Sequence, residues 1–195
     1  QTTRNRDDQK RADDLVKRNF SADRPDQLWV SDFTYIQTHS GWVYTAFIID
    51  VFSRAIVGWK VSTRMNTDMV LDALEQALHD RGMPKNVIHH SDRGVQYLSI
   101  RYTNRLEAAN LRASVGTTGD SYDNALAETV NGLYKTEVIE YLKADWQGLA
   151  DVQLATLNWV DWFNKKRVHS ALGYVSPFEF EAMYYDKINP LGQVA

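Results

Sequence analysis

The chain has 195 residues, a formal net charge of −3 and no cysteine, with 44% hydrophobic and 24% charged residues. That length suits one compact domain, or one domain plus an extension, with a substantial buried core. The lack of cysteine excludes a disulfide framework, a cysteine-type zinc site and a thiol nucleophile. No apolar run is long enough to span a membrane. The acidic balance argues, at face value, against a protein that coats itself with nucleic acid.

The first 24 residues differ in composition from the rest. They carry seven Lys and Arg and five Asp and Glu, with few large apolar side chains, which is typical of a solvated helix or a linker. This charged start has no apolar segment of the signal-peptide kind. Because the first residue is Gln rather than Met, we expect a segment of a longer chain.

Three strands are predicted next. Residues 28–36 are rich in β-branched and aromatic side chains, which favours a strand. Residues 42–51 are nearly all apolar, which indicates a strand buried on both faces. Residues 54–62 form a third candidate. The connections are short, so we expect an antiparallel meander.

Helices and strands then alternate. A helix begins at residues 66–68, continues with apolar residues at helical spacing and ends at Gly82 and Pro84. The elements expected after it are a strand at 87–90, a helix at 97–110, a strand at 111–115, a mobile loop at 116–123, and helices at 124–141 and 148–164. This order predicts an α/β fold in which helices flank a mixed five-stranded sheet, as in the ribonuclease H-like fold.

Three carboxylates occupy unusual positions. Asp32 lies inside the first strand, Asp92 directly follows the fourth, and Glu128 lies one turn into the helix after the loop. A carboxylate in a core strand is costly unless it is paired or binds a metal. Alone, Asp92 could be a turn residue and Glu128 a surface residue. The first and fourth strands are neighbours in the proposed sheet, and 35 residues separate Asp92 from Glu128, so the joint case is stronger.

Helix geometry relates Glu128 to its neighbours. At about 100° per residue, one stripe of the helix holds Asn124, Glu128, Asn131 and Lys135. We expect the sheet to be covered by the opposite side, which holds Leu126, Val130 and Leu133. Three clustered carboxylates repel one another unless a divalent cation neutralises them, and all-oxygen ligation suits Mg²⁺ or Mn²⁺.

Five motifs in order carry a resemblance to a known family. They are Trp29-Val-Ser-Asp32-Phe-Thr-Tyr35-Ile, Ile49-Asp50-Val-Phe-Ser-Arg54-Ala-Ile-Val-Gly58-Trp59, His90-Ser-Asp92-Arg-Gly94-Val-Gln96-Tyr97, Asp123-Asn124-Ala-Leu-Ala-Glu128, and Phe163-Asn164-Lys-Lys-Arg167-Val-His169-Ser-Ala-Leu-Gly-Tyr-Val-Ser-Pro177. Over residues 19–180 the chain resembles the catalytic core of DDE transposases and retroviral integrases, and most closely bacterial transposases of the insertion-sequence-3 family. The resemblance implies a linker at 1–24 from an amino-terminal DNA-binding region, a catalytic core at 25–180 and a tail at 181–195.

The resemblance also implies a chemistry. Such enzymes cut and join DNA phosphodiesters with two Mg²⁺ (or Mn²⁺) ions, and Asp32 would bridge both ions, with Asp92 holding one and Glu128 the other. Water frees a 3′-OH at an element end, and that 3′-OH attacks another phosphate. The implied partners are transposon-end and target DNA and a second copy of the chain, in at least a dimer. The implied location is the bacterial cytoplasm, at the nucleoid when bound to DNA.

Several polar residues are candidates for DNA contact. Lys135 faces the same way as Glu128, although a solvated helix lysine is an equal alternative. Asn124 could instead cap its helix. The one dense basic cluster holds Lys165, Lys166, Arg167 and His169. Its alternative role is to favour the dipole at a helix carboxyl end.

Two other functions stay open. One is a ribonuclease H or a junction resolvase, which usually carries four carboxylates, and Asp50 is the obvious fourth candidate, although a structural role there is the stronger expectation. The other is an inactive, domesticated DNA-binding module. The site accounts for three of the negative charges, and the cations are local, so the sequence predicts weak, metal-dependent DNA binding.

Overall fold

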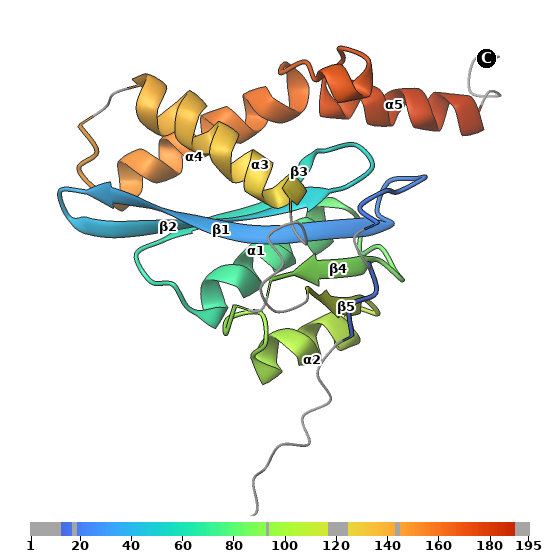
Figure 1. Ribbon diagram of the computed structural model, residues 1–195, viewed down its shortest axis with the longest axis horizontal. Helices are drawn as coiled ribbons and strands as arrows, with labels where there is room; N and C mark the ends of the chain where they lie inside the picture. Colours follow the sequence, from blue (N-terminus) through green and yellow to red (C-terminus); the bar gives the residue numbers. More distant parts are fainter. Residues whose placement is uncertain (1–12, 17–18, 93, 117–124, 143–144, 190–195) are drawn as a thin grey trace, which may run out of the picture.

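A computed structural model describes residues 13–16, 19–92, 94–116, 125–142 and 145–189. A five-stranded sheet lies between two layers of helices (Figure 1). The strands are β1 (Leu28–Thr38), β2 (Gly41–Asp50), β3 (Ile56–Ser62), β4 (Ile88–Ser91) and β5 (Arg112–Val115). The helices are α1 (Thr67–Asp80), α2 (Ile100–Ala108), α3 (Ala125–Tyr134), the π-helix η1 (Lys135–Glu140), α4 (Leu149–Lys165), the 3₁₀-helix η2 (Ser170–Leu172) and α5 (Pro177–Ile188).

The sheet has the strand order β3-β2-β1-β4-β5. The first three strands form an antiparallel meander, and β4 and β5 run parallel to β1. This mixed sheet with helices on both faces confirms the fold expected from the sequence. The predicted mobile loop lies outside the described residues, except for Gly116.

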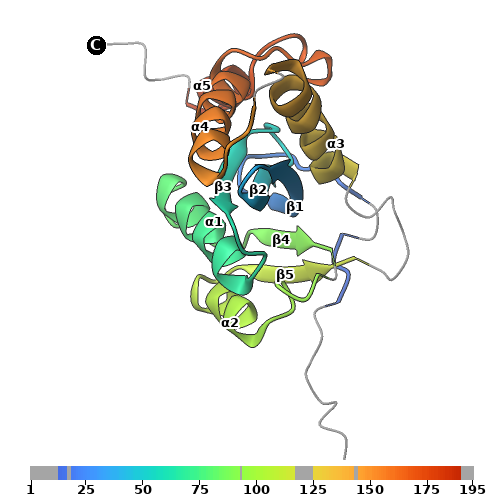
Figure 2. The same ribbon diagram turned by 90° about the vertical axis from the view of Figure 1, so that its left-hand side faces the viewer.

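Two hydrophobic cores lie on the two faces of the sheet (Figure 2). Helices α3 and α4 cover one face, where Val30 and Phe47 of the sheet meet Tyr134 and Trp159. Helices α1 and α2 cover the other face, where Trp29 and other sheet residues pack. Neighbouring residues of a strand point to opposite faces, so the nearly continuous apolar run of β2 serves both cores.

Some boundaries differ from the predictions. The third strand begins at Ile56, because Arg54 has a φ of 62° and its N–H donates to the Asp50 carbonyl in a turn. The second helix begins at Ile100, where Ser99 provides the cap, rather than at residue 97. The predicted helix at 124–141 is described from residue 125 and changes from α to π geometry at Lys135.

Helix α5 was not predicted. Ser176 and Glu179 form a reciprocal capping box with Pro177 at the first helical position, which is a strong helix start. The helix continues past residue 180, where the sequence suggested that the core ends. It is held by Arg81, which bonds Asp26 and Glu181 across side chains that are each 11–14% exposed. A buried carboxylate–guanidinium group thus joins α5 to the start of β1 and the end of α1.

Gly58 makes the closest packing between a helix and the sheet. A Cβ atom at this position of β3 would lie 2.3 Å from the Ala73 carbonyl oxygen and 2.9 Å from the Ala77 Cβ, both in α1. By contrast, a Cβ at Gly132 of α3 would meet nothing within 4 Å.

We therefore predict opposite effects of alanine at these two glycines. Gly58→Ala should lower the free energy of unfolding by about 1–3 kcal/mol, because the helix backbone must move away. Gly132→Ala should raise it by about 0.5–1 kcal/mol, because alanine favours helix. Urea denaturation measures both changes. Equal effects of the two substitutions would contradict this packing.

Candidate active site

Strand pairing brings Asp32 and Asp92 together. Strands β1 and β4 are parallel and pair from Leu28 with Ile88 to Ser31 with Ser91. Asp32 and Asp92 each follow the last of these pairs, so they hold equivalent positions on neighbouring strands, which lie about 4.8 Å apart in a sheet. The two aspartates thus lie side by side where β4 ends.

Asp32 is partly buried and carries two hydrogen bonds. Its Oδ1 accepts from the N–H of Phe33 at 2.8 Å, and its Oδ2 accepts from Nδ2 of Asn131 at 2.9 Å. Burial raises the pKa of Asp32 to about 6, the two hydrogen bonds oppose that rise, and the charges of Asp92 and Glu128 add to it. No described cation forms an ion pair with Asp32. Among the residues that the structure describes, no cationic side chain therefore compensates the negative charge of Asp32.

Asp92 is exposed and shapes a turn. Its Oδ1 accepts from the N–H of Gly94 at 2.9 Å. A Cβ at Gly94 would lie 2.9 Å from that same oxygen, so a larger residue there would force the Asp92 side chain to shift. Asp92 thus has the local hydrogen bond of a turn residue, and within the part of the chain that the structure describes no hydrogen bond is given to its other carboxylate oxygen. The neighbouring Arg93 lies outside the described residues.

Glu128 lies in the first turn of α3 and is exposed. Its charge makes the smallest contribution to the raised pKa of Asp32, so the two carboxylates are near enough to interact electrostatically. Within the described residues, however, no three His, Cys, Asp or Glu side chains are gathered closely enough to hold a metal ion. The structure thus pairs the two aspartates and leaves Glu128 at the rim of the site.

The buried face of α3 differs from the predicted one. Ala127, Val130, Asn131 and Tyr134 face the sheet, whereas Leu126 and Leu133 are only half-buried. The prediction was therefore only partly right: Val130 packs on the sheet and Glu128 is exposed as expected, but Asn131 of the same stripe lies against β1. The amide of Asn131 donates to Asp32, and its buried Oδ1 has no hydrogen-bond partner.

Asn131 is the site residue that sequence reasoning missed. It stood on the same stripe as Glu128, three residues later, and that spacing was the available signal. It was passed over because an amide has no charge to mark it.

The predicted DNA contacts do not form one group. Lys135 places its Nζ 5.1 Å from the centroid of the Tyr35 ring, on the same helical run as Glu128. Asn124 lies outside the described residues. The basic cluster lies at the carboxyl end of α4, beside the first residue of β3, because Asn164 exchanges hydrogen bonds with the backbone of Ile56. Since β2 and β1 separate β3 from β4, this cluster lies across the sheet from Asp92.

Members of that basic cluster have local partners. Lys165 pairs with Asp161. Arg167 pairs with Glu137 of η1 at 2.7 Å. Lys166 is exposed at the end of α4. Burial and the neighbouring Arg167 lower the pKa of His169 to about 4, so it is neutral at pH 7.

Asp50 has a structural environment. Its side chain is fully buried and accepts hydrogen bonds from the N–H of Asp26, the N–H of Ser53 and the hydroxyl of Ser53. Burial raises the pKa of Asp50 to about 6 against these three hydrogen bonds. The carboxylate closes the turn between β2 and β3 and is not available as a fourth member of the site.

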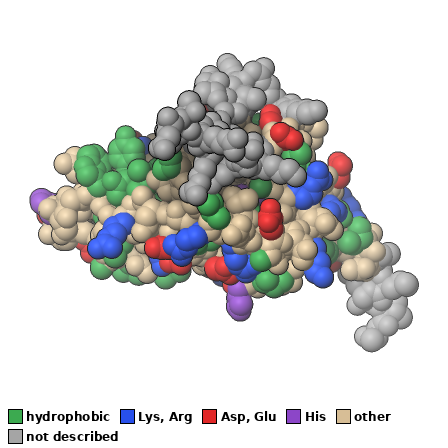
Figure 3. Space-filling model, turned by 90° about the horizontal axis from the view of Figure 1, so that it is seen from below, with side chains coloured by type: hydrophobic (Ala, Val, Ile, Leu, Met, Phe, Trp, Pro, Cys, Tyr) green, Lys and Arg blue, Asp and Glu red, His purple; other side chains and the backbone are tan. Residues whose placement is uncertain are grey.

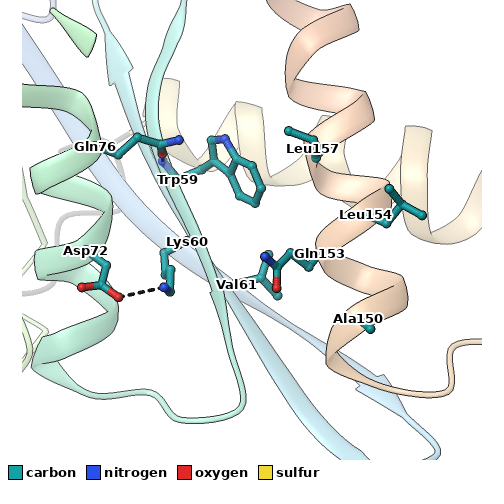
Figure 4. A pocket seen from close by; sticks show the side chains of 9 residues that line it. All are labelled: Trp59, Lys60, Val61, Asp72, Gln76, Ala150, Gln153, Leu154 and Leu157. Carbon is teal, nitrogen blue, oxygen red and sulfur yellow. Dashed lines mark hydrogen bonds and ion pairs between the residues drawn. The ribbon is translucent and has the colours of Figure 1, made fainter. Parts of the chain in front are cut away.

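A hollow of about 620 Å³ lies at the outer edge of the sheet, away from the carboxylates. It lies over β3 between α1 and α4, and the ion pair of Lys60 and Asp72 crosses one side (Figure 4). None of the predicted site residues lines it.

Comparison with known proteins agrees with this fold. Residues 22–121 and 109–177 match two models that are both described as integrase core domain. A transposase for insertion sequence element IS629 of Shigella sonnei is 58% identical over 91% of this chain. A putative transposase for IS986/IS6110 of Mycobacterium tuberculosis is 52% identical over 88% of it. The chain spans 59% and 63% of the lengths of these two relatives.

Solved structures show the same fold at low sequence identity. A simian T-cell lymphotropic virus intasome matches with a TM-score of 0.70 and 17% identity, over 81% of this chain and 55% of that one. The HTLV-2 integrase catalytic core in complex with magnesium matches with a TM-score of 0.66 and 18% identity, over 83% of this chain and 99% of that one. The fold is thus that of integrase catalytic cores, and the chain belongs to the integrase core domain family. Within the described residues, no helix has both the length and the apolar character of a membrane span.

The raised pKa of Asp32 predicts a pH-dependent cost to stability. The folded-state pKa is about 6, against an ordinary value of 3.8. The folded state therefore binds the proton more tightly, and the stability this gives is present at low pH and lost as the pH rises through 6. Without metal, Asp32→Asn should raise the free energy of unfolding at pH 7 by roughly 1–2 kcal/mol, and by much less at pH 4.

Urea denaturation at both pH values provides the measurement, and Asp186→Asn, at an exposed position of α5, is the control. If Asp32→Asn raised the free energy of unfolding equally at pH 4 and pH 7, the negative charge of Asp32 would not be what lowers the stability.

Proposed function

We propose that this chain is the catalytic core of an insertion-sequence transposase, which cuts and joins DNA phosphodiesters. The observation that carries the proposal is the placement of Asp32 and Asp92 side by side on parallel strands, with the charge of Glu128 acting on the same region. The relatives that are 52% and 58% identical bear the name transposase, which supports a DNA substrate.

The residues present fit divalent metal ions. The donor set is three carboxylates, which is the hard oxygen ligation that Mg²⁺ and Mn²⁺ prefer. The negative charge at Asp32 lacks a described cationic partner, and the orphaned Oδ1 of Asn131 adds a buried acceptor beside it. In our proposal Asp32, Asp92 and Glu128 would hold the ions. When bound, such ions polarise the phosphate and activate the attacking oxygen.

The reaction balances without a covalent enzyme intermediate. A water oxygen forms a bond to phosphorus, the bond from phosphorus to the 3′ oxygen breaks, and a 3′-OH leaves with a proton. That 3′-OH then attacks a second phosphate and displaces another 3′ oxygen. The chain contributes negatively charged carboxylates at fixed positions, and the hydrogen bond from Asn131 restrains the Asp32 side chain. Lys135, on the same helical run as Glu128, would contact a phosphate of the DNA.

The remaining DNA contacts are proposed in two groups. Lys135 lies beside the carboxylates, with Asn124 before Glu128 in the sequence. Lys165, Lys166, Arg167 and His169 would form a second contact at the carboxyl end of α4. There Lys166 is exposed, whereas Arg167 also restrains η1 through Glu137.

Transposition brings two element ends together, so we propose that the active complex contains at least two copies of the chain on DNA. The HTLV-2 integrase core has been solved in dimeric and trimeric forms. We place the reaction in the bacterial cytoplasm, at the nucleoid. A ribonuclease H or resolvase function is not favoured, because Asp50 is committed to its own hydrogen bonds.

The glutamate of the proposed triad gives the sharpest test. Glu128→Gln keeps the side-chain shape but removes the charge that a metal ligand needs. It should lower Mg²⁺-dependent nicking of supercoiled plasmid, and joining of a 3′-OH oligonucleotide to it, by at least about 100-fold, because one removed charge-stabilising group costs about that much. The control is Glu140→Gln, at an exposed position of η1, which should retain activity. Near-normal joining by Glu128→Gln would refute the triad.

Metal binding should depend on pH through Asp32. A proton competes with the metal for the carboxylate, and the pKa of Asp32 is about 6. Mn²⁺ affinity, measured by calorimetry, should therefore fall by about 10-fold for each pH unit below 6. Asp92→Asn should abolish most of the binding at pH 7. Affinity that does not change between pH 7 and pH 5 would contradict ligation by Asp32.

A further inference from the structure

Two exposed aromatic side chains lie on the β1–β2 hairpin, on the face of β1 opposite to the Asp32 side chain. Tyr35 follows Asp32 by three residues in β1, and Trp42 lies near the start of β2. Tyr35 is paired with Tyr44 and Trp42 with Gln37, so the two rings are diagonal neighbours on one face of the hairpin. Their centroids are 5.3 Å apart in an edge-to-face contact. Tyr35 is 54% exposed and Trp42 49%, although large rings are usually well buried.

A cation completes this group. The Nζ of Lys135 lies 5.1 Å from the centroid of the Tyr35 ring, within the range of a cation–π interaction. Lys135 begins the π-helix η1, and π-helical segments occur often at functional sites. We call Tyr35, Trp42 and Lys135 the aromatic–lysine patch. Two ring surfaces and one positive charge are thus presented together.

The hairpin that carries the rings is held in place. The N–H of His39 donates to the Trp146 carbonyl at 2.9 Å, and the N–H of Ser40 donates to the Gln147 carbonyl at 3.0 Å. The Thr38 hydroxyl donates to the Gly41 carbonyl at 2.7 Å across the turn. A fixed surface binds with less loss of conformational entropy than a mobile one.

The rings also keep open surface. An edge-to-face contact covers at most one face of one ring, so the contact between Tyr35 and Trp42 leaves indole surface free. Figure 3 shows hydrophobic side chains gathered toward the end of the molecule where the β1–β2 hairpin projects in Figure 1.

The distance between Asp32 and Tyr35 along β1 can be expressed as a number of nucleotides. A strand rises about 3.3 Å per residue, so Asp32 and Tyr35 are about 10 Å apart along β1, with side chains on opposite faces. A stacked DNA strand rises about 3.4 Å per nucleotide, so this is about three nucleotides. Among the described residues, no strand pairs with β1 on its β4 side beyond Ser31, so a nucleic acid strand can cross that edge from one face to the other. The Lys135 side chain reaches the Tyr35 ring from η1, which continues α3.

We propose that the aromatic–lysine patch stacks an unpaired base of the DNA strand that is cut at the carboxylates, within about three nucleotides of the cut. Ring faces that stack bases, combined with cations that contact phosphates, are the usual means of binding single strands. The lysine favours this occupant over an apolar protein segment, since a phosphate neighbours every base. The proposal rests on the proposed function, because it assumes that DNA lies at Asp32.

The test measures binding without catalysis. The 195-residue chain is titrated in Ca²⁺ against a fluorescent oligothymidylate, an abasic oligomer with the same phosphates, and a blunt duplex. Trp42→Leu should weaken binding of the oligothymidylate by about 10-fold, which is the scale of one lost base stack, and should leave the abasic oligomer unchanged. Trp42→Phe keeps a ring and should restore most of the affinity. Tyr35→Leu should behave like Trp42→Leu.

The matched control is Trp162→Leu. Trp162 lies on α4, is 44% exposed and belongs to neither proposed DNA contact, so its loss should not change binding. Circular dichroism and thermal unfolding check that each variant is folded. Equal loss of affinity for the abasic oligomer would overturn the proposal, and so would a change in oligomeric state with unchanged DNA binding.

Failure of this proposal can be told from failure of the proposed function. If Glu128→Gln abolishes nicking but Trp42→Leu binds the oligothymidylate as tightly as the wild type, the function stands and the stacking site is refuted. If neither the wild type nor any variant nicks DNA, but Trp42→Leu still weakens binding of the oligothymidylate, the stacking site stands and the catalytic function fails.

Discussion

The site depends on the point at which β4 stops pairing with β1. Four residues of β4 lie parallel to the start of β1, and the pairing ends at Ser31 and Ser91. Parallel pairing puts the next residues of both strands at the same level, so two aspartates meet although 59 residues lie between them in the chain. A longer β4 would cover the rest of β1, whereas a shorter one would separate the two carboxylates. The same early ending leaves open the edge of β1 that leads to the aromatic–lysine patch.

Electrostatics then distinguishes the carboxylates of the sheet. Asp32 and Asp50 are both buried enough to raise their pKa values to about 6. Asp50 receives three hydrogen bonds and completes a turn, so both of its carboxylate oxygens have hydrogen-bond donors within the chain. Asp32 receives two and also faces the charges of Asp92 and Glu128. Burial thus gives one carboxylate a structural role and leaves the other without a cationic partner among the described residues, in line with the proposed metal site.

The sequence predicted the sheet, the neighbouring positions of its first and fourth strands, and three carboxylates as candidates for the site. It could do so because hydrophobic periodicity and charged residues inside apolar strands are local signals. It did not predict the contact of Asn131 with Asp32, because a helical wheel shows which residues share a stripe and not how that stripe is turned toward the sheet. The pairing of Arg167 with Glu137 links residues that are 30 positions apart, and no periodicity reports such a contact. Helix α5 was missed although its capping box was readable, because the segment was assigned to a tail.

The attachment of α5 has a consequence for substitutions at its base. The Arg81 guanidinium bonds both Asp26 and Glu181, through side chains that are 11–14% exposed. Removal of either carboxylate therefore leaves a buried cation with only part of its counter-charge, and it loosens α5, β1 and α1 together. One guanidinium thus anchors three elements, beside the ring contacts of Phe52 with Phe180 and Tyr184.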